Sequence, residues 1–457
     1  MTPQQLEVAE PSERDFLLTA APHLNRSTRA EPFLRIDPPD LQQPRTIRLA
    51  LAGCGVVGGG LVRLLQESAA ATAARFGVRF VFARVLVRDP ARDRRLPIDS
   101  RLFTNDLDSF LAQDADIVVE ALGGDEPART IAIRSLQRGR KVVTANKDLI
   151  ATHGESLHAL AHKNFTVIDF GAAVGGSAPV ISTLRDLLGA GAPRSIRGIL
   201  NGTANFVISG IERGQRLDEA LAAAREGGLA EADCARDLDG RDAAAKLDIL
   251  AWIAFGIQPS TLDVRRISLL PGLEDLVRFA HERGARVRQI AECSQLEGNS
   301  VSASVEPVIV PDATPFGRTV FEENRVEVDL GWTSPLSVSG PGAGGAPTAA
   351  ALLSDLLRAS NPTSTGGRGS PKFFSVADYR EHRWLVCGRL DSRTVSLFAD
   401  KLGIPIRLEF AASETAYVVT DRITWARARQ LLDVLEKLGV APSVARYELT
   451  DFDEVTE

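Results

Sequence analysis

The stretch Ile47–Gly58, IRLALAGCGVVG, decides the fold of the first part of this chain. A short apolar run typical of a buried strand ends in a Gly-x-Gly-x-x-Gly turn, and leucines at helical spacing follow it. In this strand–turn–helix setting the pattern predicts dinucleotide binding, with the cofactor's phosphates at the helix N-terminus. The alternative is a glycine-rich turn without a ligand. The residues predicted to surround the phosphates are Gly53, Gly55, Val56, Val57 and Gly58.

Strand-like and helical segments alternate after this turn, which predicts an α/β fold with a Rossmann-type, doubly wound parallel sheet. The further strands are expected at Phe80–Val87, Asp116–Ala121, Lys141–Ala145 and Thr166–Phe170. We place this dinucleotide-binding domain at residues 46–170. A loosely ordered extension, rich in Pro, Gln, Arg and Glu, is expected at residues 1–45.

An α+β substrate-binding and dimerisation domain is predicted over residues 171–360, with its last segment, near 340–360, returning to the first domain. Its expected elements are strands at Ile196–Leu200, Val301–Val310, Arg325–Leu330 and Leu336–Ser339, and helices at 241–256 and Pro347–Arg358. A linker follows at 361–381. Residues 382–457 show the order βαββαβ of a ferredoxin-like module. Since every candidate site residue precedes Pro371, we expect the tail to be dispensable for catalysis.

Composition excludes several classes of protein. The 457 residues carry a net charge of −6 without a basic tract, which argues against nucleic-acid binding. The four cysteines form no CxxC pair, which fits a reducing compartment and no zinc site. Because no apolar run reaches the length of a membrane span and no signal peptide pattern is present, we expect a cytoplasmic protein with a small-molecule substrate and no membrane partner.

Candidate chemistry is concentrated between Glu231 and Lys246. Asp242 and Lys246 are four residues apart, so they share one face of the predicted helix. Glu231 adds a carboxylate from the preceding loop. Carboxylates hold an amino group and a lysine handles a proton, so the set suits a small zwitterionic substrate. The alternative is an ordinary surface ion pair.

Two further cations follow strands of the predicted parallel sheet. Lys147 lies directly after Lys141–Ala145, at the edge where ligands bind in open α/β sheets. Arg88, followed by Asp89, ends the second strand, where a cation favours the 2′-phosphate of NADP and an acid favours the free ribose of NAD. The cofactor is therefore NADP or NAD, with NADP slightly favoured.

Six motifs in this order resemble those of homoserine dehydrogenases and cover roughly residues 46–360. They are Gly53–Gly58, Val143–Lys147, Ala172–Gly176, Gly198–Asn205, Gly228–Asp233 with Gly240–Lys246, and Gly340–Gly344 with Pro347–Ala349. The resemblance implies NAD(P)-dependent interconversion of L-homoserine and L-aspartate 4-semialdehyde, in the aspartate-derived pathway to threonine, methionine and isoleucine. It also implies a homodimer or a higher homo-oligomer.

The resemblance also implies roles for single residues. Lys246 matches the residue that exchanges the proton, and Lys147 the lysine near both cofactor and substrate. Glu231 and Asp242 match the carboxylates that hold the substrate's amino group. The substrate-facing turn corresponds to Gly202 and Thr203, and the cofactor-closing positions correspond to Gly228, Gly342 and Gly344. Backbone carbonyls that bind a sodium ion correspond to Gly171, Val174, Gly176 and Ala178.

The chain departs from the family's pattern at Gly171, where a glutamate is usual. Because no aspartokinase-like segment precedes the motifs, the chain looks like the monofunctional form. The C-terminal module resembles an ACT domain in element order. Two alternatives remain: a reductase of another amino-acid semialdehyde, and a catalytically silent dinucleotide sensor.

Overall fold

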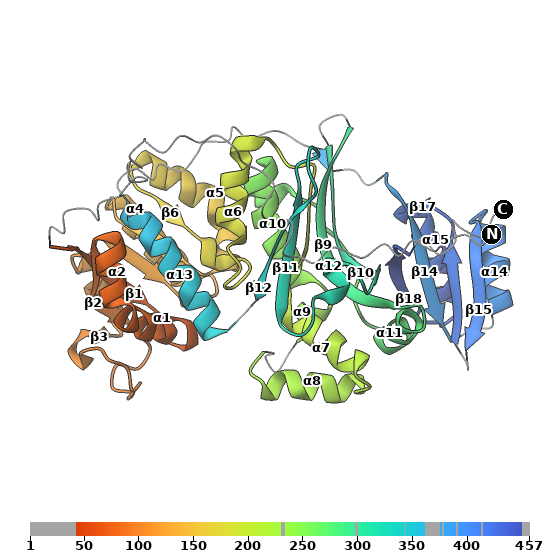
Figure 1. Ribbon diagram of the computed structural model, residues 1–457, viewed down its shortest axis with the longest axis horizontal. Coiled ribbons are helices and arrows are strands. Elements are labelled where there is room, and N and C mark those ends of the chain that lie inside the picture. The colour runs from red at the N-terminus through yellow and green to blue at the C-terminus, as the bar shows by residue number, and fades with distance from the viewer. Residues whose placement is uncertain are drawn as a thin grey trace, which may run out of the picture. The chain divides into compact units, whose positions relative to one another are not determined.

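The computed structural model describes residues 43–229, 234–297, 300–342, 344–361, 375–376, 379–389, 392–412 and 415–449. The first six strands that the structure describes form a fully parallel sheet with the order β3-β2-β1-β4-β5-β6 (Figure 1). The order reverses between β1 and β4, the kind of position where open α/β sheets bind ligands. The predicted α/β fold class is confirmed.

Five strands of this sheet lie within a few residues of those expected, and the short strand β3 was not predicted. The strands are β1 (Arg45–Ala52), β2 (Val78–Leu86), β3 (Phe103–Thr104), β4 (Ile117–Glu120), β5 (Lys141–Thr144) and β6 (Ile168–Asp169). The helices are α1 (Val56–Glu67), α2 (Ala69–Phe76), α3 (Leu107–Ala112), α4 (Ala128–Gln137) and α5 (Lys147–Lys163), with a 3-10 turn at Ser100–Leu102.

Alternation along β1 decides which helices cover each face of the sheet. Leu51 packs with Leu61 of α1 and with Leu352 of α13 (Gly345–Ser360). Its neighbour Ala50 faces the other way and packs with Phe110 of α3. Helix α13, which comes from far along the chain, therefore lies beside α1 on the parallel sheet (Figure 1).

A second, mixed sheet has twelve strands, with the path β12-β11-β7-β9-β10-β18-β14-β16-β15. Its first part contains β7 (Ser195–Ile199), β8 (Arg265–Arg266), β9 (Ala285–Leu296), β10 (Ser300–Pro311), β11 (Glu323–Asp329) and β12 (Leu336–Pro341). The helices here are α6 (Val180–Leu187), α7 (Gly202–Glu212), α8 (Leu217–Glu226), α9 (Ala235–Leu238), α10 (Arg241–Phe255), α11 (Leu273–His281) and α12 (Pro315–Arg318). The 3-10 turns are η3 (Gly171–Ala173), η4 (Leu188–Ala190) and η5 (Pro259–Thr261).

Strand β9 was not predicted, although it is central in this sheet. Its polar residues look like those of a surface segment, but Arg288 and Glu292 are both buried. Arg288 pairs with Glu212 at 2.7 Å, and Glu292 pairs with Arg446 at 2.8 Å. Distant partners therefore compensate the buried charges of β9.

The C-terminal module has the ferredoxin-like strand order β18-β14-β16-β15. Its elements are β14 (Glu381–Gly388), α14 (Ser392–Lys401), β15 (Ile406–Ala412), β16 (Thr415–Thr420), β17 (Ile423–Thr424), α15 (Trp425–Lys437) and β18 (Ser443–Tyr447). Strand β13 (Ser375–Val376), within the segment predicted as a linker, pairs with β10.

The module continues the sheet of the preceding domain. Strand β18 pairs in parallel with β10 through Val308 and Ile309, and the buried Arg446 of β18 pairs with Glu292 and Glu306 at 2.8 and 3.0 Å. Removing the tail would leave two buried carboxylates without this cation, which is costly. Loss of the tail should therefore destabilise the preceding domain, while its being dispensable for catalysis stays a prediction.

None of the helices in the part of the chain that the structure describes has the length and apolar character to cross a membrane.

Candidate active site

The glycine turn after β1 has the shape that a bound pyrophosphate needs. Gly53 has a φ of +93°, and a Cβ atom there would lie 2.5 Å from the carbonyl oxygen of Ala121. A Cβ on Gly58 would lie 2.0 Å from the carbonyl oxygen of Gly53. At Gly55, the N-cap of α1, a Cβ would meet nothing within 4 Å. Gly53 and Gly58 thus permit the tight turn, while the space at Gly55 stays open for a ligand.

Val56 and Val57 begin helix α1 and so stand where its free N–H groups point. Val56 is 77% exposed, whereas Val57 is half-buried against the core of the parallel sheet. These residues fit a nicotinamide dinucleotide whose phosphates lie against the helix N-terminus.

Arginines lie near the end of β2, where the ribose of the dinucleotide is expected to bind. Arg88 is exposed and lies two residues after the end of β2. Arg94, which was not predicted, donates from Nη2 to the carbonyl oxygen of Asp89 at 2.8 Å. Burial raises the pKa of the Cys54 thiol, while nearby Arg94 and Arg63 act in the opposite direction. Positive charge therefore gathers beside the glycine turn.

Two lysines meet on one carboxylate at the centre of the predicted site. Asp242 and Lys246 lie one turn apart on α10, and their side chains pair at 2.8 Å. Lys147, the first residue of α5, reaches the other Asp242 oxygen at 3.1 Å. The exposed fractions of the side chains are 14% for Asp242, 13% for Lys246 and 31% for Lys147. This cluster is not a solvated surface ion pair.

Mutual attraction sets the charge states in this cluster. Burial opposes the ionised form of Asp242, but Lys246 and Lys147 outweigh it and hold its pKa well below the usual range. Burial also opposes the charge on Lys147, but Asp242 and Asp148 outweigh it and raise the pKa of this lysine. Asp242 is therefore ionised, and its charge favours the charged form of Lys147.

Asn201 and Asp237, neither of them predicted, complete the cluster. The Asn201 amide nitrogen donates to Oδ1 of Asp237 and to Oδ2 of Asp242, both at 2.8 Å. Lys246 Nζ donates to the carbonyl oxygen of Leu200 at 2.7 Å. The sequence signals were present, since Asn201 precedes Gly202 in a quoted motif and Asp237 lies within the Glu231–Lys246 stretch.

The predicted substrate-facing turn lies next to this cluster. Gly202 and Thr203 form the first turn of α7, which Asn201 caps. The Thr203 hydroxyl donates to the carbonyl oxygen of Leu229 at 2.8 Å. Nearby Gly228 has a φ of +69°, and a Cβ atom on it would meet nothing within 4 Å. Glu231, in the following loop, lies outside the described residues.

Gly171 begins the turn η3 against a carboxylate of α13. A Cβ on Gly171 would lie 2.3 Å from Oδ1 of Asp355, and Asp355 Oδ2 accepts the Ala172 N–H at 2.9 Å. Asp355 also pairs with Arg358. Burial, reinforced by the nearby Asp169 charge, raises the pKa of Asp355 to about 7. The space that a side chain at position 171 would need is thus filled by a carboxylate from elsewhere in the chain.

The rest of the predicted sodium loop packs under the segment that leads into α13. Gly176, with a φ of +58°, comes so close that a Cβ would lie 2.4 Å from the carbonyl oxygen of Pro341. The carbonyl oxygen of Ala178 accepts the Val180 N–H at 2.7 Å. Val174 is buried in the core beside α10.

Gly342 and Gly344 flank the start of α13, and each has a reason to be glycine. A Cβ on Gly342 would lie 2.1 Å from the side-chain oxygen of Asn324. Gly344 is the N-cap of α13 and has a φ of +114°. This arrangement brings the predicted cofactor-closing segment near α1, since a Cβ on Gly345 would lie 2.9 Å from the Val56 side chain.

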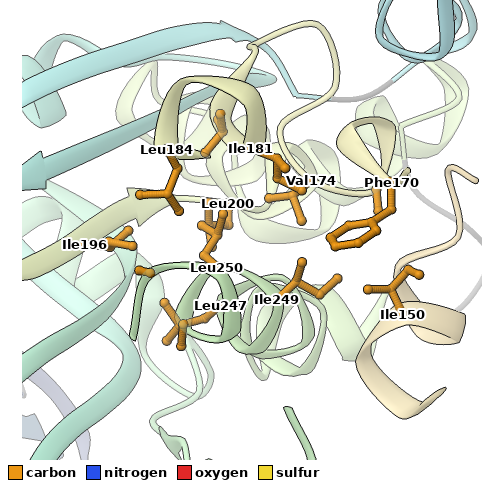
Figure 2. Close-up of a cluster of buried hydrophobic side chains, with 14 of the residues drawn as sticks. Ile150, Phe170, Val174, Ile181, Leu184, Ile196, Leu200, Leu247, Ile249 and Leu250 are labelled. Atoms are coloured by element: carbon orange, nitrogen blue, oxygen red, sulfur yellow. The ribbon is translucent and has the colours of Figure 1, made fainter. Parts of the chain in front are cut away.

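An apolar cluster holds α10 in place beneath the charged residues. Figure 2 shows Ile249 and Leu250 pointing from this helix toward Phe170, Val174 and Leu200. Ile249 and Leu250 are fully buried, and each such side chain contributes roughly 1.5–3 kcal/mol. The helix that carries Asp242 and Lys246 is therefore anchored rigidly.

Comparison with known proteins agrees with this geometry. Residues 53–170 match the family model described as "Homoserine dehydrogenase, NAD binding domain", and residues 179–357 match the model "Homoserine dehydrogenase". The homoserine dehydrogenase of Mycobacterium tuberculosis is 34% identical over 432 residues, which cover 88% of this chain and 97% of that protein. That of Bacillus subtilis is 33% identical and covers 68% of this chain and 72% of its own length.

Solved structures of similar proteins share the fold. A homoserine dehydrogenase from Thiobacillus denitrificans superposes with a TM-score of 0.78 at 28% identity, covering 88% of this chain and 98% of that one. One from Staphylococcus aureus gives a TM-score of 0.70 at 26% identity, covering 89% and 99%.

Proposed function

Because this chain belongs to the homoserine dehydrogenase family, we propose that the residues around Asp242 interconvert L-homoserine and L-aspartate 4-semialdehyde with a nicotinamide cofactor. The activity is that of an NAD(P)-dependent oxidoreductase in amino-acid biosynthesis. The observation that supports these residue roles is the largely buried Lys147–Asp242–Lys246 cluster.

The lysines account for the proton chemistry. The bound nicotinamide supplies or accepts the hydride. Lys246 would exchange the proton of the substrate's hydroxyl oxygen, and its contacts with Asp242 at 2.8 Å and with the Leu200 carbonyl oxygen at 2.7 Å support this role. A charged lysine also stabilises the negative charge that develops on that oxygen during reduction of the aldehyde. Lys147 adds a second positive charge at the cofactor edge of the sheet.

Carboxylates beside the lysines hold the substrate's ammonium group. The family resemblance assigns this role to Glu231 and Asp242, and we add Asp237. Both oxygens of Asp242 already accept from lysines, whereas Oδ2 of Asp237 has no hydrogen-bond partner among the described residues. Gly202 and Thr203 line the neighbouring turn. Fixing the ammonium group orients the reacting carbon toward the nicotinamide.

The cofactor preference is proposed to be for NADP. Arg88 follows β2 and Arg94 lies near the glycine turn, so the ribose end carries positive charge suited to a 2′-phosphate. Asp89, whose carboxylate could serve a free ribose, already accepts the Ala91 N–H at 3.0 Å.

Three further expectations belong to this proposal. The carbonyls of Gly171, Val174, Gly176 and Ala178 would hold a sodium ion; a carbonyl oxygen has two lone pairs, so the bond that Ala178 accepts leaves one free. The enzyme would act in the cytoplasm, in agreement with its four free cysteines. It would form a homodimer or a higher homo-oligomer.

One assay separates the proposal from its alternatives. Purified protein is incubated with L-homoserine and NADP or NAD, and absorbance of the reduced cofactor is followed. We expect turnover with homoserine, faster with NADP, and its loss in Lys246→Ala. Turnover only with the alcohol of another amino-acid semialdehyde would indicate a different reductase. Cofactor binding without any turnover would indicate a dinucleotide sensor.

A further inference from the structure

Asn201 occupies the point where three parts of the site meet. It is 4% exposed and stands between β7 and α7. Its side-chain oxygen accepts the Ala204 N–H at 2.7 Å and so caps α7. Its amide nitrogen uses both hydrogens on carboxylates, donating to Asp237 and Asp242 at 2.8 Å each. Every group of the side-chain amide is therefore engaged.

We infer that Asn201 is a positioning residue for the proposed reaction: by tying Asp237 to Asp242, its amide sets where the carboxylates stand relative to the lysines and the substrate's ammonium group. This inference rests on the proposed function of the site. It differs from a plain capping role, because a cap needs only the side-chain oxygen.

The physical need for such a bridge is the repulsion between two neighbouring carboxylates. Burial raises the pKa of Asp237, and the Asp242 charge raises it further. The hydrogen bond from Asn201 lowers it, as do the charges of Lys246 and Lys147. Hydrogen bonds to ionised groups are strong ones. Asn201 thus favours the ionised form of Asp237, the form that attracts an ammonium group.

The direction of the pH effect follows from this arrangement. Without the amide donor, Asp237 becomes protonated at a higher pH than in the wild type. Since only the ionised form binds the ammonium group, KM for homoserine should begin to rise at a higher pH as the solution is acidified. A side chain that only capped α7 would leave this profile unchanged.

Two substitutions separate bridging from capping. Asn201→Ser keeps an oxygen that can cap α7, because serine is about as good an N-cap as asparagine, but its one hydroxyl hydrogen cannot serve two carboxylates. Asn201→Asp keeps the shape and the cap but places a third carboxylate against the other two. Asp106→Ser, at the N-cap of α3, is the matched control for a change of cap away from the site.

We expect Asn201→Ser to raise KM for homoserine by about ten- to a hundredfold, the range for losing a hydrogen bond to a charged group. The cofactor's Kd should stay within a few-fold of wild type, and the acid rise of KM should move to higher pH. Asn201→Asp should have the larger effect. The inference would be overturned if Asn201→Ser kept the wild-type KM and pH profile and only its melting temperature fell, as in Asp106→Ser. Asn201 would then act only as the N-cap of α7.

A direct titration keeps this test separate from that of the function. Carbon-13 NMR of labelled aspartate carboxyls, with the Asp237 signal assigned through Asp237→Asn, reports its pKa without turnover. We expect a higher pKa in Asn201→Ser than in the wild type, even if homoserine proves not to be the substrate. An unchanged pKa would refute the bridge regardless of what the activity assay shows.

Discussion

The turn at Gly53–Gly58 and the cluster around Asp242 are built in different ways. The turn depends on backbone shape: Gly53 and Gly58 leave no room for a Cβ, and the helix N-terminus supplies the donors. The cluster depends on side chains from α5, α9 and α10 and from the N-cap of α7, which meet within hydrogen-bonding distance. One is local in sequence and the other is assembled by the fold.

This difference separates binding from chemistry. A backbone turn holds phosphates at fixed positions whatever the protonation of its surroundings. A cluster of charges, in contrast, keeps each group's protonation state through its neighbours, as Asp242 does for Lys147. Substitutions in the cluster should therefore change turnover and its pH dependence, and substitutions in the turn should change cofactor affinity.

Among the variants considered, Lys246→Ala should have the largest effect. It should separate turnover from cofactor affinity most clearly. Its loss removes the proposed proton donor, and general acid–base catalysis is worth about 10²–10⁴-fold in rate. We expect turnover at saturating homoserine and cofactor to fall by that range, while the Kd of the cofactor, measured by fluorescence titration, changes little. Lys163→Ala, at the end of α5, is the control.

Turnover of Lys246→Ala within a few-fold of wild type would contradict this assignment. Lys147, on the other oxygen of Asp242, would then be the group that moves the proton.

The fold was predictable to the extent that its signals were local. Strand β1 and the glycine turn were expected because a short apolar run and three glycines suffice to identify them. Strand β9 was missed because Arg288 and Glu292 resemble surface residues until their partners Glu212 and Arg446 are known. The burial of those charges depends on contacts that no short window of sequence contains.

The same limit applies to the candidate site. Asp242 and Lys246 were found together because helical spacing places them on one face. Asn201 was not singled out, because its role depends on Asp237 and Asp242, which lie far along the chain and approach it only in the fold. Gly171 looked like a simple loss of a carboxylate until the structure placed Asp355 against it.

Asp242→Asn tests whether the charged cluster controls the pH dependence of the reaction. The neutral amide no longer offsets the effect of burial on Lys147, so the pKa of this lysine should fall. If both lysines act in their charged forms, the basic limb of the kcat/KM profile moves to lower pH. A profile over the full range with homoserine measures this, and an unmoved basic limb would show that Lys147 does not control it.

Gly171→Ala tests whether a backbone position can depend on a distant side chain. The added Cβ would approach Oδ1 of Asp355 to 2.3 Å, so the Asp355 carboxylate, the turn or α13 must shift. Overpacking of this kind costs about 1–3 kcal/mol, which should appear as a lower melting temperature. The double variant Gly171→Ala/Asp355→Ala should recover part of the loss. Equal melting temperatures for Gly171→Ala and wild type would show that the contact with Asp355 does not restrict position 171.

Arg88→Asp should have the smallest effect. Arg88 contributes only one side chain to a cofactor site that is formed mainly by backbone groups. Arg88 is exposed and Arg94 remains nearby, so the phosphate turn should keep its shape and most of its affinity. We expect KM for NADP to rise by about tenfold, in line with the loss of one charged hydrogen bond, while KM for NAD changes less. Arg94→Asp, measured beside it, shows which cation faces the 2′-phosphate. If both variants leave the ratio of the two KM values unchanged, the charge near the glycine turn has no part in choosing the cofactor, and the preference must arise from residues elsewhere around the ribose.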